Sequence, residues 1–525
     1  MPSFLQESQI FVSWLSTVGV TMSPKITVSD LRKDHQGRGV VAVEDIEANE
    51  DIFTIPRSAI INVSNCSLIE DKPHLSQKLL KLSQWESLVV VLLYELKVKN
   101  NDSKWLPYFN VLPIKDTDNY FFNQLVHWSD EDLSALEPSL ILERVGKDVS
   151  TQMFNRLYPK IIVERLGLHE LKGVTIEEFF SVASLIMSYS FDVERPASLE
   201  EKLQAEDQEE DNEEEHKIKS NEEYPSEDDD EDEDKVDEDE LLNGGFFKSM
   251  VPLADTLNAD TTLHNASLTY SESGLIMRSI KPIKKGEQVY NSYFDHPNSE
   301  ILRRYGYVET QGSSHDFAEI PLAIVRSIFS KEYSVSTEFL DEIFQILNEI
   351  VIADDEDGES AEIVLDSYDC FKTREVILEF VFIIQVLTII LAINEKEKIS
   401  SWNHEEMYKM VHRVFQKCYQ LVESKKLTNK FKANFEKILK ERLKAYPQIA
   451  SEPYTKEMAF SRAQMAEVVL KSEYQSLKNC LEIDETFKNG PMGTYKFIED
   501  EKLIRNIMKK RAPEDSDKDN KKRKL

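Results

Sequence analysis

The stretch that decides the fold runs from Met250 to Glu309 and reads MVPLADTLNADTTLHNASLTYSESGLIMRSIKPIKKGEQVYNSYFDHPNSEILRRYGYVE. It joins a loop rich in Asn and Asp to three short segments of alternating apolar and polar residues, a pattern typical of half-buried strands. Two tyrosines, Tyr293 and Tyr305, lie near its end. We interpret this stretch as one half of a split functional site whose other half lies near the N-terminus.

Gly37-Arg38-Gly39 marks the N-terminal half of that site. It leads into the apolar run Val40 to Val43, which reads as a strand and not as a helix. A dinucleotide fold places its glycines before a helix N-terminus, where amides meet phosphate, so that class of site is excluded here. Two glycines before a strand instead allow the backbone to approach a small ligand closely, and a plain turn is the alternative interpretation.

Two segments share one pattern although they lie far apart in the sequence. Ala42 to Ile55 and Ser279 to Ser292 both read as strand, I-x-x-x-E, strand, with Ile46 matching Ile283. We interpret them as strand-turn-strand units of one β fold that a helical insert has separated.

Helical periodicity returns between and after these β-rich segments, with apolar residues three and four apart. The sequence therefore predicts an α+β protein: a β-rich domain split by a helical insert, followed by an all-α domain. The predicted boundaries are residues 1–70 for the first half, 71–185 for the insert, 186–312 for the second half with a disordered loop at 200–240, 313–495 for the all-α domain and 496–525 for a basic tail.

Charge is concentrated in one segment of this 525-residue chain. The formal net charge is −33, and the run from Glu206 to Glu240 contributes −19 through 22 acidic residues against 3 lysines. That run has almost no apolar residues to offset the entropy of ordering, so it is predicted to be disordered. The other residues carry −14, which argues against a broad nucleic-acid-binding surface.

Cysteine usage and the termini indicate a reducing compartment. The four cysteines form no C-x-x-C pair, so we expect neither a zinc site nor a disulfide framework, and the N-terminus lacks a signal-peptide pattern. The apolar run from Phe380 to Ile393 is short for a membrane span, so we expect a buried helix and no membrane partner.

Two basic clusters within Lys509 to Leu525 fit a bipartite nuclear import signal. They predict an import receptor as a partner and the nucleus as the location, with the cytoplasm as a second compartment. A frayed, solvated terminus is the alternative interpretation.

The loop around Asn258 gathers polar side chains between two apolar segments: Asp255, Asn258, Asp260, His264 and Asn265. An Asn amide can bond both to the backbone and to a ligand, and an Asx-rich turn is the alternative. Taken singly, Tyr293 and Tyr305 are typical of amphipathic core residues.

A resemblance rests on six motifs that follow one another along the chain. They are G-R-G, W-x-x-Y-x-x-x-L-P from Trp105 to Pro113, S-x-x-F from Ser188 to Phe191, D-x-L-N from Asp255 to Asn258, GEQVYNSY from Gly286 to Tyr293, and E-x-x-x-x-YGYVE from Glu300 to Glu309. Together they resemble the SET-domain protein methyltransferases, and more closely the Rubisco large-subunit methyltransferase branch, in which a helical insert splits the SET domain and a helical substrate-binding domain follows. The last two motifs are similar to those of the fungal ribosomal lysine methyltransferases. The resemblance covers residues 1 to 490.

This resemblance implies an S-adenosylmethionine-dependent protein-lysine N-methyltransferase that acts on a basic ribosomal protein of the large (60S) subunit. It implies Tyr293 as the tyrosine at the point of methyl transfer, and a substrate side formed by Ser190 and Asp255. The cofactor-binding residues that it implies are Gly37, Arg38, Gly39, Tyr189, Asn258, Ala259 and Tyr305.

Three positions depart from the family pattern: Ala259 replaces a histidine, Tyr189 stands where many relatives have arginine, and Phe294 where many have glycine. The other residue types suit the chemistry, because a lysine ε-amine must lose its proton, from a reference pKa of about 10.4, before it attacks a sulfonium methyl group. A narrow, desolvated channel disfavours the charged amine, and carbonyl oxygens and a tyrosine hydroxyl can steer it. Such a transfer needs no metal.

Two other functions fit the same observations. Methylation of a histidine, as in an actin-directed branch of the same family, shares every motif above. A non-enzymatic acidic nuclear chaperone with a decayed SET fold would account for Glu206 to Glu240 and the basic tail. In an enzyme, the acidic run can also attract a basic substrate by electrostatic steering.

Overall fold

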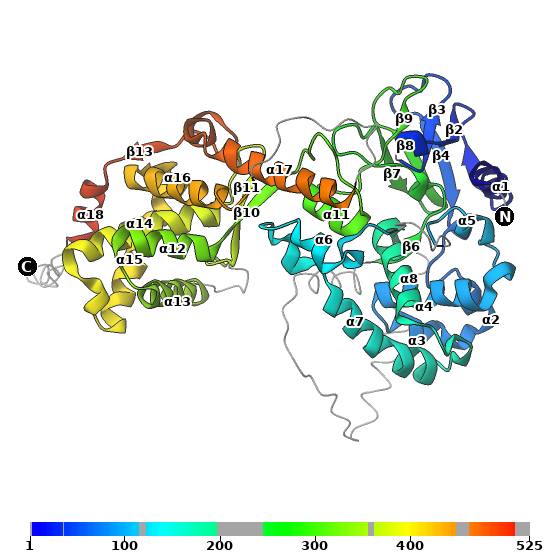
Figure 1. Cartoon of the computed structure of the whole chain (residues 1–525), viewed down its shortest axis with the longest axis horizontal. Helices are drawn as coiled ribbons and strands as arrows, with labels where there is room; N and C mark the ends of the chain where they lie inside the picture. Colours follow the sequence, from blue (N-terminus) through cyan, green and yellow to red (C-terminus); the bar gives the residue numbers. More distant parts are fainter. Residues whose placement is uncertain are drawn as a thin grey trace, which may run out of the picture. The chain divides into compact units, whose positions relative to one another are not determined.

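The computed structural model describes residues 3–34, 36–114, 122–196, 245–354, 362–447 and 461–509 (Figure 1). The acidic loop predicted at 200–240 and residues 510–525 of the predicted tail lie outside the described residues. The chain divides into two compact units. The first unit comprises Met1–Leu133, Glu143–Gln311 and Pro453–Met465, and the second comprises Ser134–Leu142, Gly312–Glu452 and Ala466–Leu525.

The first unit is built on antiparallel sheets that combine strands from both halves of its sequence. One sheet has the order β1-β4-β8-β7 and another the order β2-β3-β9, while β5 pairs with β6. The bounds are β1 Thr21–Met22, β2 Ile26–Asp30, β3 Arg38–Ala42, β4 Asp51–Pro56, β5 Ser190–Glu194, β6 Phe246–Met250, β7 Ala266–Tyr270, β8 Gly274–Ser279 and β9 Gln288–Val289. Because β4 pairs with β8 and β3 with β9, the sheets join segments that the insert separates in the sequence.

Within the first unit, the two segments that share the I-x-x-x-E pattern lie against each other. Ile46 and Ile283 form an antiparallel bridge in which each amide donates to the other's carbonyl at 2.9 Å. Both isoleucines are buried in the core of the first unit. The repeated pattern predicts two similar strand-turn-strand segments, and the structure shows that these segments pair with each other.

Helix α4 (Gln84–Leu93) is the buried centre of the insert. Ser83 caps it in a capping box with Glu86, and every residue from Leu88 to Leu93 is buried. The other α-helices of the first unit are α1 Phe4–Thr17, α2 Ser67–Asp71, α3 Ser76–Leu80, α5 Leu106–Phe109, most of α6 Asp130–Ser134, α7 Lys147–Arg156, α8 Ile176–Tyr189 and α11 Asn298–Tyr305. The predicted boundary at residue 185 falls inside α8, and Ser134–Leu142, which the sequence assigns to the insert, groups with the second unit.

The second unit is mainly helical, as predicted, but it also contains two short sheets that the sequence pattern did not indicate. β10 (Phe317–Pro321) pairs antiparallel with β11 (Ser367–Phe371), and β12 (Lys426–Thr428) pairs parallel with β13 (Lys496–Ile498). Its helices are α12 Leu322–Tyr333, α13 Thr337–Asp354, α14 Leu378–Glu397, α15 His404–Glu423, α16 Asn429–Leu443, most of α17 Arg462–Cys480, and α18 Asp500–Met508.

Helix α14 forms the centre of the second unit. Every residue from Phe380 to Asn394 is buried, and the buried Gln385 accepts a hydrogen bond from the amide of Thr428 at 3.0 Å. By length and composition α14 could also cross a membrane, but most of it is buried inside the unit. The sequence-based expectation of a buried core helix is confirmed.

Strand β13 and helix α18 correct the predicted start of the basic tail at residue 496. Leu503, Ile504 and Ile507 of α18 are buried in the core of the second unit. These residues recur at helical spacing, so the packed chain continues past the predicted boundary at least as far as Ile507.

Candidate active site

The two halves of the first unit meet where β3 begins. A β-carbon on Gly39 would lie 2.8 Å from Nδ2 of Asn258 and 2.5 Å from Cδ1 of Leu31, so a larger residue would displace its neighbours. Gly37 has a φ of +63°, a conformation that favours glycine. The structure thus brings the G-R-G and D-x-L-N motifs together.

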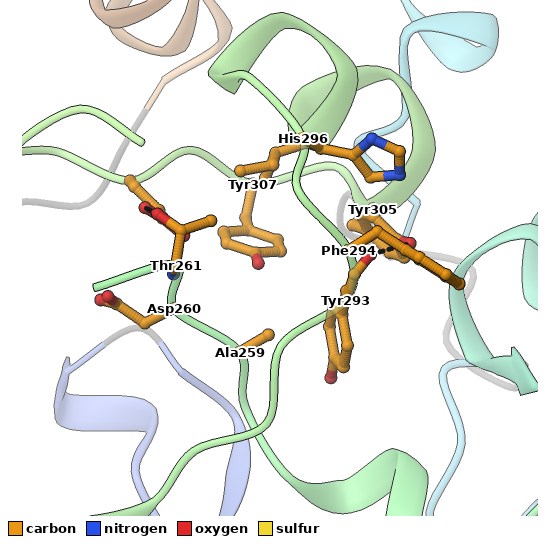
Figure 2. A pocket seen from close by; sticks show the side chains of 10 residues that line it. Ala259, Asp260, Thr261, Tyr293, Phe294, His296, Tyr305 and Tyr307 are labelled. Carbon is orange, nitrogen blue, oxygen red and sulfur yellow. Dashed lines mark hydrogen bonds between the residues drawn. The ribbon is translucent and has the colours of Figure 1, made fainter. Parts of the chain in front are cut away.

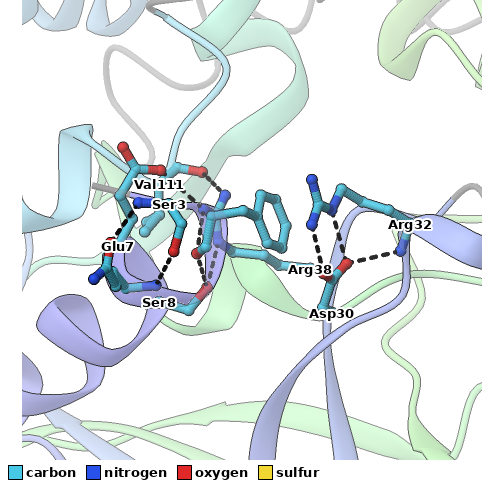
Figure 3. A network of polar contacts seen from close by, with 9 residues as sticks. Ser3, Glu7, Ser8, Asp30, Arg32, Arg38 and Val111 are labelled. Atoms are coloured by element: carbon cyan, nitrogen blue, oxygen red, sulfur yellow. Dashed lines mark hydrogen bonds and ion pairs between the residues drawn. The ribbon is translucent and has the colours of Figure 1, made fainter. Parts of the chain in front are cut away.

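The side chain of Arg38 is held by α1 and the insert (Figure 3). Its Nε donates to Oγ of Ser8 at 2.9 Å, and a terminal nitrogen donates to the carbonyl of Val111 at 2.9 Å. The guanidinium also lies 3.8 Å from the centroid of the Phe4 ring, and burial lowers its pKa. The side chain therefore fastens α1 and the insert to β3.

Asn258 is held by β9 and the loop that follows it. Its Nδ2 donates to Oε1 of Gln288 at 3.0 Å, and its carbonyl accepts from the amide of Asn291 at 3.0 Å. Nε2 of Gln288 donates in turn to the hydroxyl of Tyr290 at 2.9 Å. Ala259 forms a parallel bridge with Asn291, so its main chain belongs to the same arrangement. The predicted site did not include Gln288, and the only indication of its role in the sequence was its place within the GEQVYNSY motif.

Tyr293 and Tyr305 form a hydrogen-bonded aromatic pair (Figure 2). The Tyr293 hydroxyl donates to the Leu257 carbonyl at 2.5 Å, and the Tyr305 hydroxyl donates to the Tyr293 carbonyl at 3.1 Å. The ring centroids lie 5.0 Å apart. Burial raises the pKa of Tyr305 to about 12 and the pKa of Tyr293 well above its usual value. Both phenols therefore keep their protons at neutral pH and act as donors.

A small pocket, open to solvent, includes this pair in its wall. The lining residues are Ala259, Asp260, Thr261, Tyr293, Phe294, His296, Ile301, Tyr305, Tyr307 and Glu309. On one side, Glu309 accepts from the amide of Thr261 at 2.7 Å and from its hydroxyl at 2.6 Å. Figure 2 shows Tyr307 and Thr261 across the pocket from Tyr305. An aromatic wall of this kind suits a flat ring such as adenine. Sequence reasoning missed Tyr307, although it lies in the YGYVE motif.

Asp255 is buried beside phenols from three parts of the first unit. Its carboxylate accepts a hydrogen bond from the hydroxyl of Tyr108, and burial raises its pKa to about 7. Burial raises the pKa of Tyr189 to about 12, and the nearby charge of Asp255 acts in the same direction on Tyr189 and Tyr293. Ser190 follows Tyr189 and begins β5. The structure thus brings together Asp255, Tyr189 and Tyr293, and it adds Tyr108, which the predicted site did not include.

Comparison with known proteins agrees with this geometry. Residues 37–294 match the SET domain. Ribosomal lysine N-methyltransferase 4 of Saccharomyces cerevisiae is 38% identical to this chain over 528 residues, which cover 98% of each chain. The chain belongs to the SET-domain lysine methyltransferases. The family that the six motifs indicate is thereby confirmed.

More distant SET-domain proteins share the fold. The N-lysine methyltransferase SETD6 of Rattus norvegicus is 29% identical over 325 residues, which cover 60% of this chain and 57% of that protein. The solved structure of LSMT bound to lysine and AdoHcy matches 96% of each chain with a TM-score of 0.56 and 19% identity. Rubisco LSMT bound to AdoMet matches 95% of each chain with a TM-score of 0.54 and 19% identity. These structural similarities establish the fold of this SET-domain protein.

Proposed function

We propose that this SET-domain protein transfers methyl groups from S-adenosylmethionine to a lysine of a ribosomal protein of the large (60S) subunit. The name of the yeast relative supports the substrate class, because the similarity extends over nearly the whole of both chains. The observation that carries the proposal is the contact of Gly39 with Asn258, directly after the Leu257 carbonyl that holds Tyr293.

The residues around Gly39 fit the cofactor. Glycine lets the side chains of Leu31, Asn258 and Gln288 pack directly against the main chain of β3, where a β-carbon would clash with them. We assign cofactor binding to the main chain of Gly37 to Gly39, to Asn258 and Ala259, and to the aromatic wall at Tyr305 and Tyr307. When bound, S-adenosylmethionine supplies an activated methyl group on a sulfonium centre.

The residues of the chain itself orient the acceptor amine. A lysine ε-amine is protonated in water, with a pKa of about 10.4, and a narrow channel between aromatic rings disfavours the charged form by desolvation. Hydrogen bonds to the carbonyls of Leu257 and Tyr293 fix the two phenol rings that line this channel. The same carbonyl oxygens can stabilise positive charge that develops during transfer. Catalysis then rests on positioning and not on a covalent intermediate.

We assign docking of the protein substrate to the second unit, in accordance with the family arrangement of a SET domain followed by a helical domain. A formal net charge of −33 favours a basic partner such as a ribosomal protein. The acidic run from Glu206 to Glu240 would act by steering, and its deletion should then lower the association rate mainly at low salt.

The direct test is transfer of labelled methyl groups to ribosomal proteins from a strain that lacks the endogenous enzyme. We expect label in one protein of the large subunit, with mass spectrometry placing the methyl group on lysine. Ribosomal proteins from the parent strain, already methylated, should take up little label. Label on histidine would favour the actin-directed type of activity, and absence of label from all ribosomal proteins would refute the proposed substrate class.

We also propose that the basic clusters within Lys509 to Leu525 bind an import receptor and direct the protein to the nucleus. Residues 509–525 fused to a fluorescent protein should accumulate in nuclei. Replacement of the basic residues in either cluster by alanine should restore an even distribution, and a fusion that never enters nuclei would contradict this assignment.

A further inference from the structure

A buried tyrosine of the insert, Tyr108, reaches the candidate active site from a separate part of the fold. It lies in α5, its side chain is fully buried, and its hydroxyl donates to the carboxylate of Asp255. Phe11 and Trp14 of α1 stack on its ring, with centroids 6.2 and 6.5 Å away. These contacts fix the ring, so the position of the hydroxyl is set by the packing of α1 and the insert.

The turn that carries Asp255 also carries the carbonyl that holds Tyr293. Asp255 lies in the short helix Ala254–Thr256, and Leu257 follows it directly and accepts the hydrogen bond of Tyr293. Leu253, at the start of the turn, has a φ of +80°, a costly conformation for a branched residue, and is fully buried. A turn of this kind needs surrounding contacts to hold it, and the bond from Tyr108 is one of them.

A chain of contacts therefore runs from the insert to the aromatic pair. The Tyr108 hydroxyl bonds to Asp255, the turn continues to the Leu257 carbonyl, this carbonyl holds the Tyr293 hydroxyl, and the Tyr293 carbonyl holds Tyr305. We propose that Tyr108 is a positioning residue for methyl transfer, which holds ionised Asp255 and, through the turn, the hydroxyl of Tyr293. The proposal rests on the proposed function, because it assigns Tyr293 to the transfer site.

The titration of Asp255 allows this role to be measured. Hydrogen bonds from the hydroxyls of Tyr108 and Thr256 and from the backbone lower the pKa of Asp255, against the larger effect of burial. The charge of Asp255 raises the pKa values of Tyr108, Tyr189 and Tyr293, and the charge of Arg38 lowers the pKa of Tyr189. Burial raises the pKa of each of these phenols, so they stay protonated near neutral pH, and Arg38 stays charged. Within this cluster Asp255 is thus the group that titrates near neutrality. The Tyr108 bond favours its ionised form, so loss of that bond should raise the pKa of Asp255 further.

The test compares Tyr108→Phe with a matched control, Tyr94→Phe. Tyr94 is also a buried tyrosine of the first unit, and its hydroxyl donates to the carboxylate of Asp71 at 2.8 Å, outside the site. Tyr108→Phe should lower kcat about tenfold to a hundredfold, the range expected for a lost hydrogen bond to a charged group, while S-adenosylmethionine affinity by calorimetry stays within about twofold. Tyr94→Phe should leave kcat at the wild-type value.

The pH dependence separates positioning from general loss of stability. If ionised Asp255 is the active form, the wild-type rate divided by the Tyr108→Phe rate should fall as the pH rises from about 6 to about 9, because the variant ionises later. Titration of the substrate lysine affects both rates equally and cancels in this ratio.

Thermal unfolding supplies a readout that does not depend on activity. The Tm difference between wild type and Tyr108→Phe should grow over the same pH range, since the lost bond matters most to the ionised carboxylate. The pKa of Asp71 is lowered by its bonds to Lys99 and Tyr94, so Asp71 is ionised throughout this range, and the Tm difference for Tyr94→Phe should stay constant.

Wild-type kcat in Tyr108→Phe, or a rate ratio that does not change with pH, would overturn the positioning role. A wild-type protein that methylates no ribosomal protein would instead refute the proposed function. The Tm measurements would still show whether Tyr108 holds ionised Asp255.

Discussion

Asp255 in the first unit and Glu473 in the second are buried carboxyl groups with similar surroundings and different consequences. Burial raises the pKa of each to about 7, and each accepts a hydrogen bond from a tyrosine hydroxyl, from Tyr108 and Tyr446 respectively. Asp255 lies in the turn that leads to the candidate active site, whereas Glu473 lies among contacts within the second unit. A shifted pKa therefore identifies a buried carboxyl group, and its neighbours decide whether it serves the reaction.

The neighbours of Glu473 form a structural joint, by which we mean the hydrogen bonds that link the segment Ser134–Leu142 to the rest of the second unit. Its carboxylate accepts from the hydroxyl of Ser139 at 2.5 Å and from Tyr446 at 2.8 Å. The buried Arg442 donates to the carbonyls of Pro138 and Glu319, at 2.9 Å each. These bonds fasten Ser134–Leu142 to the helices of the second unit. The buried carboxyl group of Glu473 and the buried guanidinium of Arg442 thus both have hydrogen-bond partners, without which burying them would be destabilising.

The largest effect should come from Tyr293→Phe, which removes only the hydroxyl that bonds to Leu257. We expect kcat to fall about a hundredfold or more, by analogy with the loss of one donor that stabilises charge in a transition state. Cofactor binding by calorimetry should remain measurable, and the Tm should change little. Full activity of this variant on its native substrate would remove Tyr293 from the transfer site.

Glu473→Ala should show the opposite pattern. It leaves the hydroxyls of Ser139 and Tyr446 buried without their acceptor, which should lower the free energy of unfolding by about 2–4 kcal/mol. Urea denaturation measures this loss, and kcat per folded molecule should match wild type. A fall in kcat of the folded fraction would mean that the joint also serves the reaction.

The sequence predicts the parts of the site that lie in compact motifs. Gly39, Asn258, Tyr293 and Tyr305 were all marked by their motifs, and the structure brings them to one place. Tyr108 stood inside the W-x-x-Y motif, but its partner Asp255 lies 147 residues away, and no local spacing reveals such a pair.

The side chain of Arg38 shows another limit of sequence reasoning. The resemblance implied backbone contacts of Arg38 with the cofactor and gave no role to its side chain, whose guanidinium tertiary packing directs to α1 and Val111. In the second unit, periodicity predicts the helices but not the strands β10 to β13, of which β12 and β13 have only three residues each and are too short to show an alternating pattern.

The raised pKa values of Asp255 and Glu473 also predict how stability depends on pH. The folded-state pKa values of Asp255 and Glu473, about 7, lie above those of an unfolded chain, about 4. Between these values the two groups therefore bind more protons in the folded protein than in the unfolded chain, and their contribution to stability should fall as the pH rises from about 5 to about 8. Glu473→Gln, which cannot titrate, should reduce this slope, and Tm measurements across the range would show it. The same pH dependence of Tm in wild type and in Glu473→Gln would contradict the raised pKa of Glu473.

The smallest expected effect is that of Ser139→Ala, which removes one of the two hydroxyl donors to Glu473. Tyr446 still bonds to the carboxylate, so the free energy of unfolding should fall by only about 1 kcal/mol, with kcat and KM unchanged. Denaturant titration and steady-state rates measure both quantities. Because Ser139 belongs to the segment Ser134–Leu142, which lies within the insert in sequence but groups with the second unit, a change in kcat would show that this segment influences the active site. Glu473 would then resemble Asp255 in function as well as in environment.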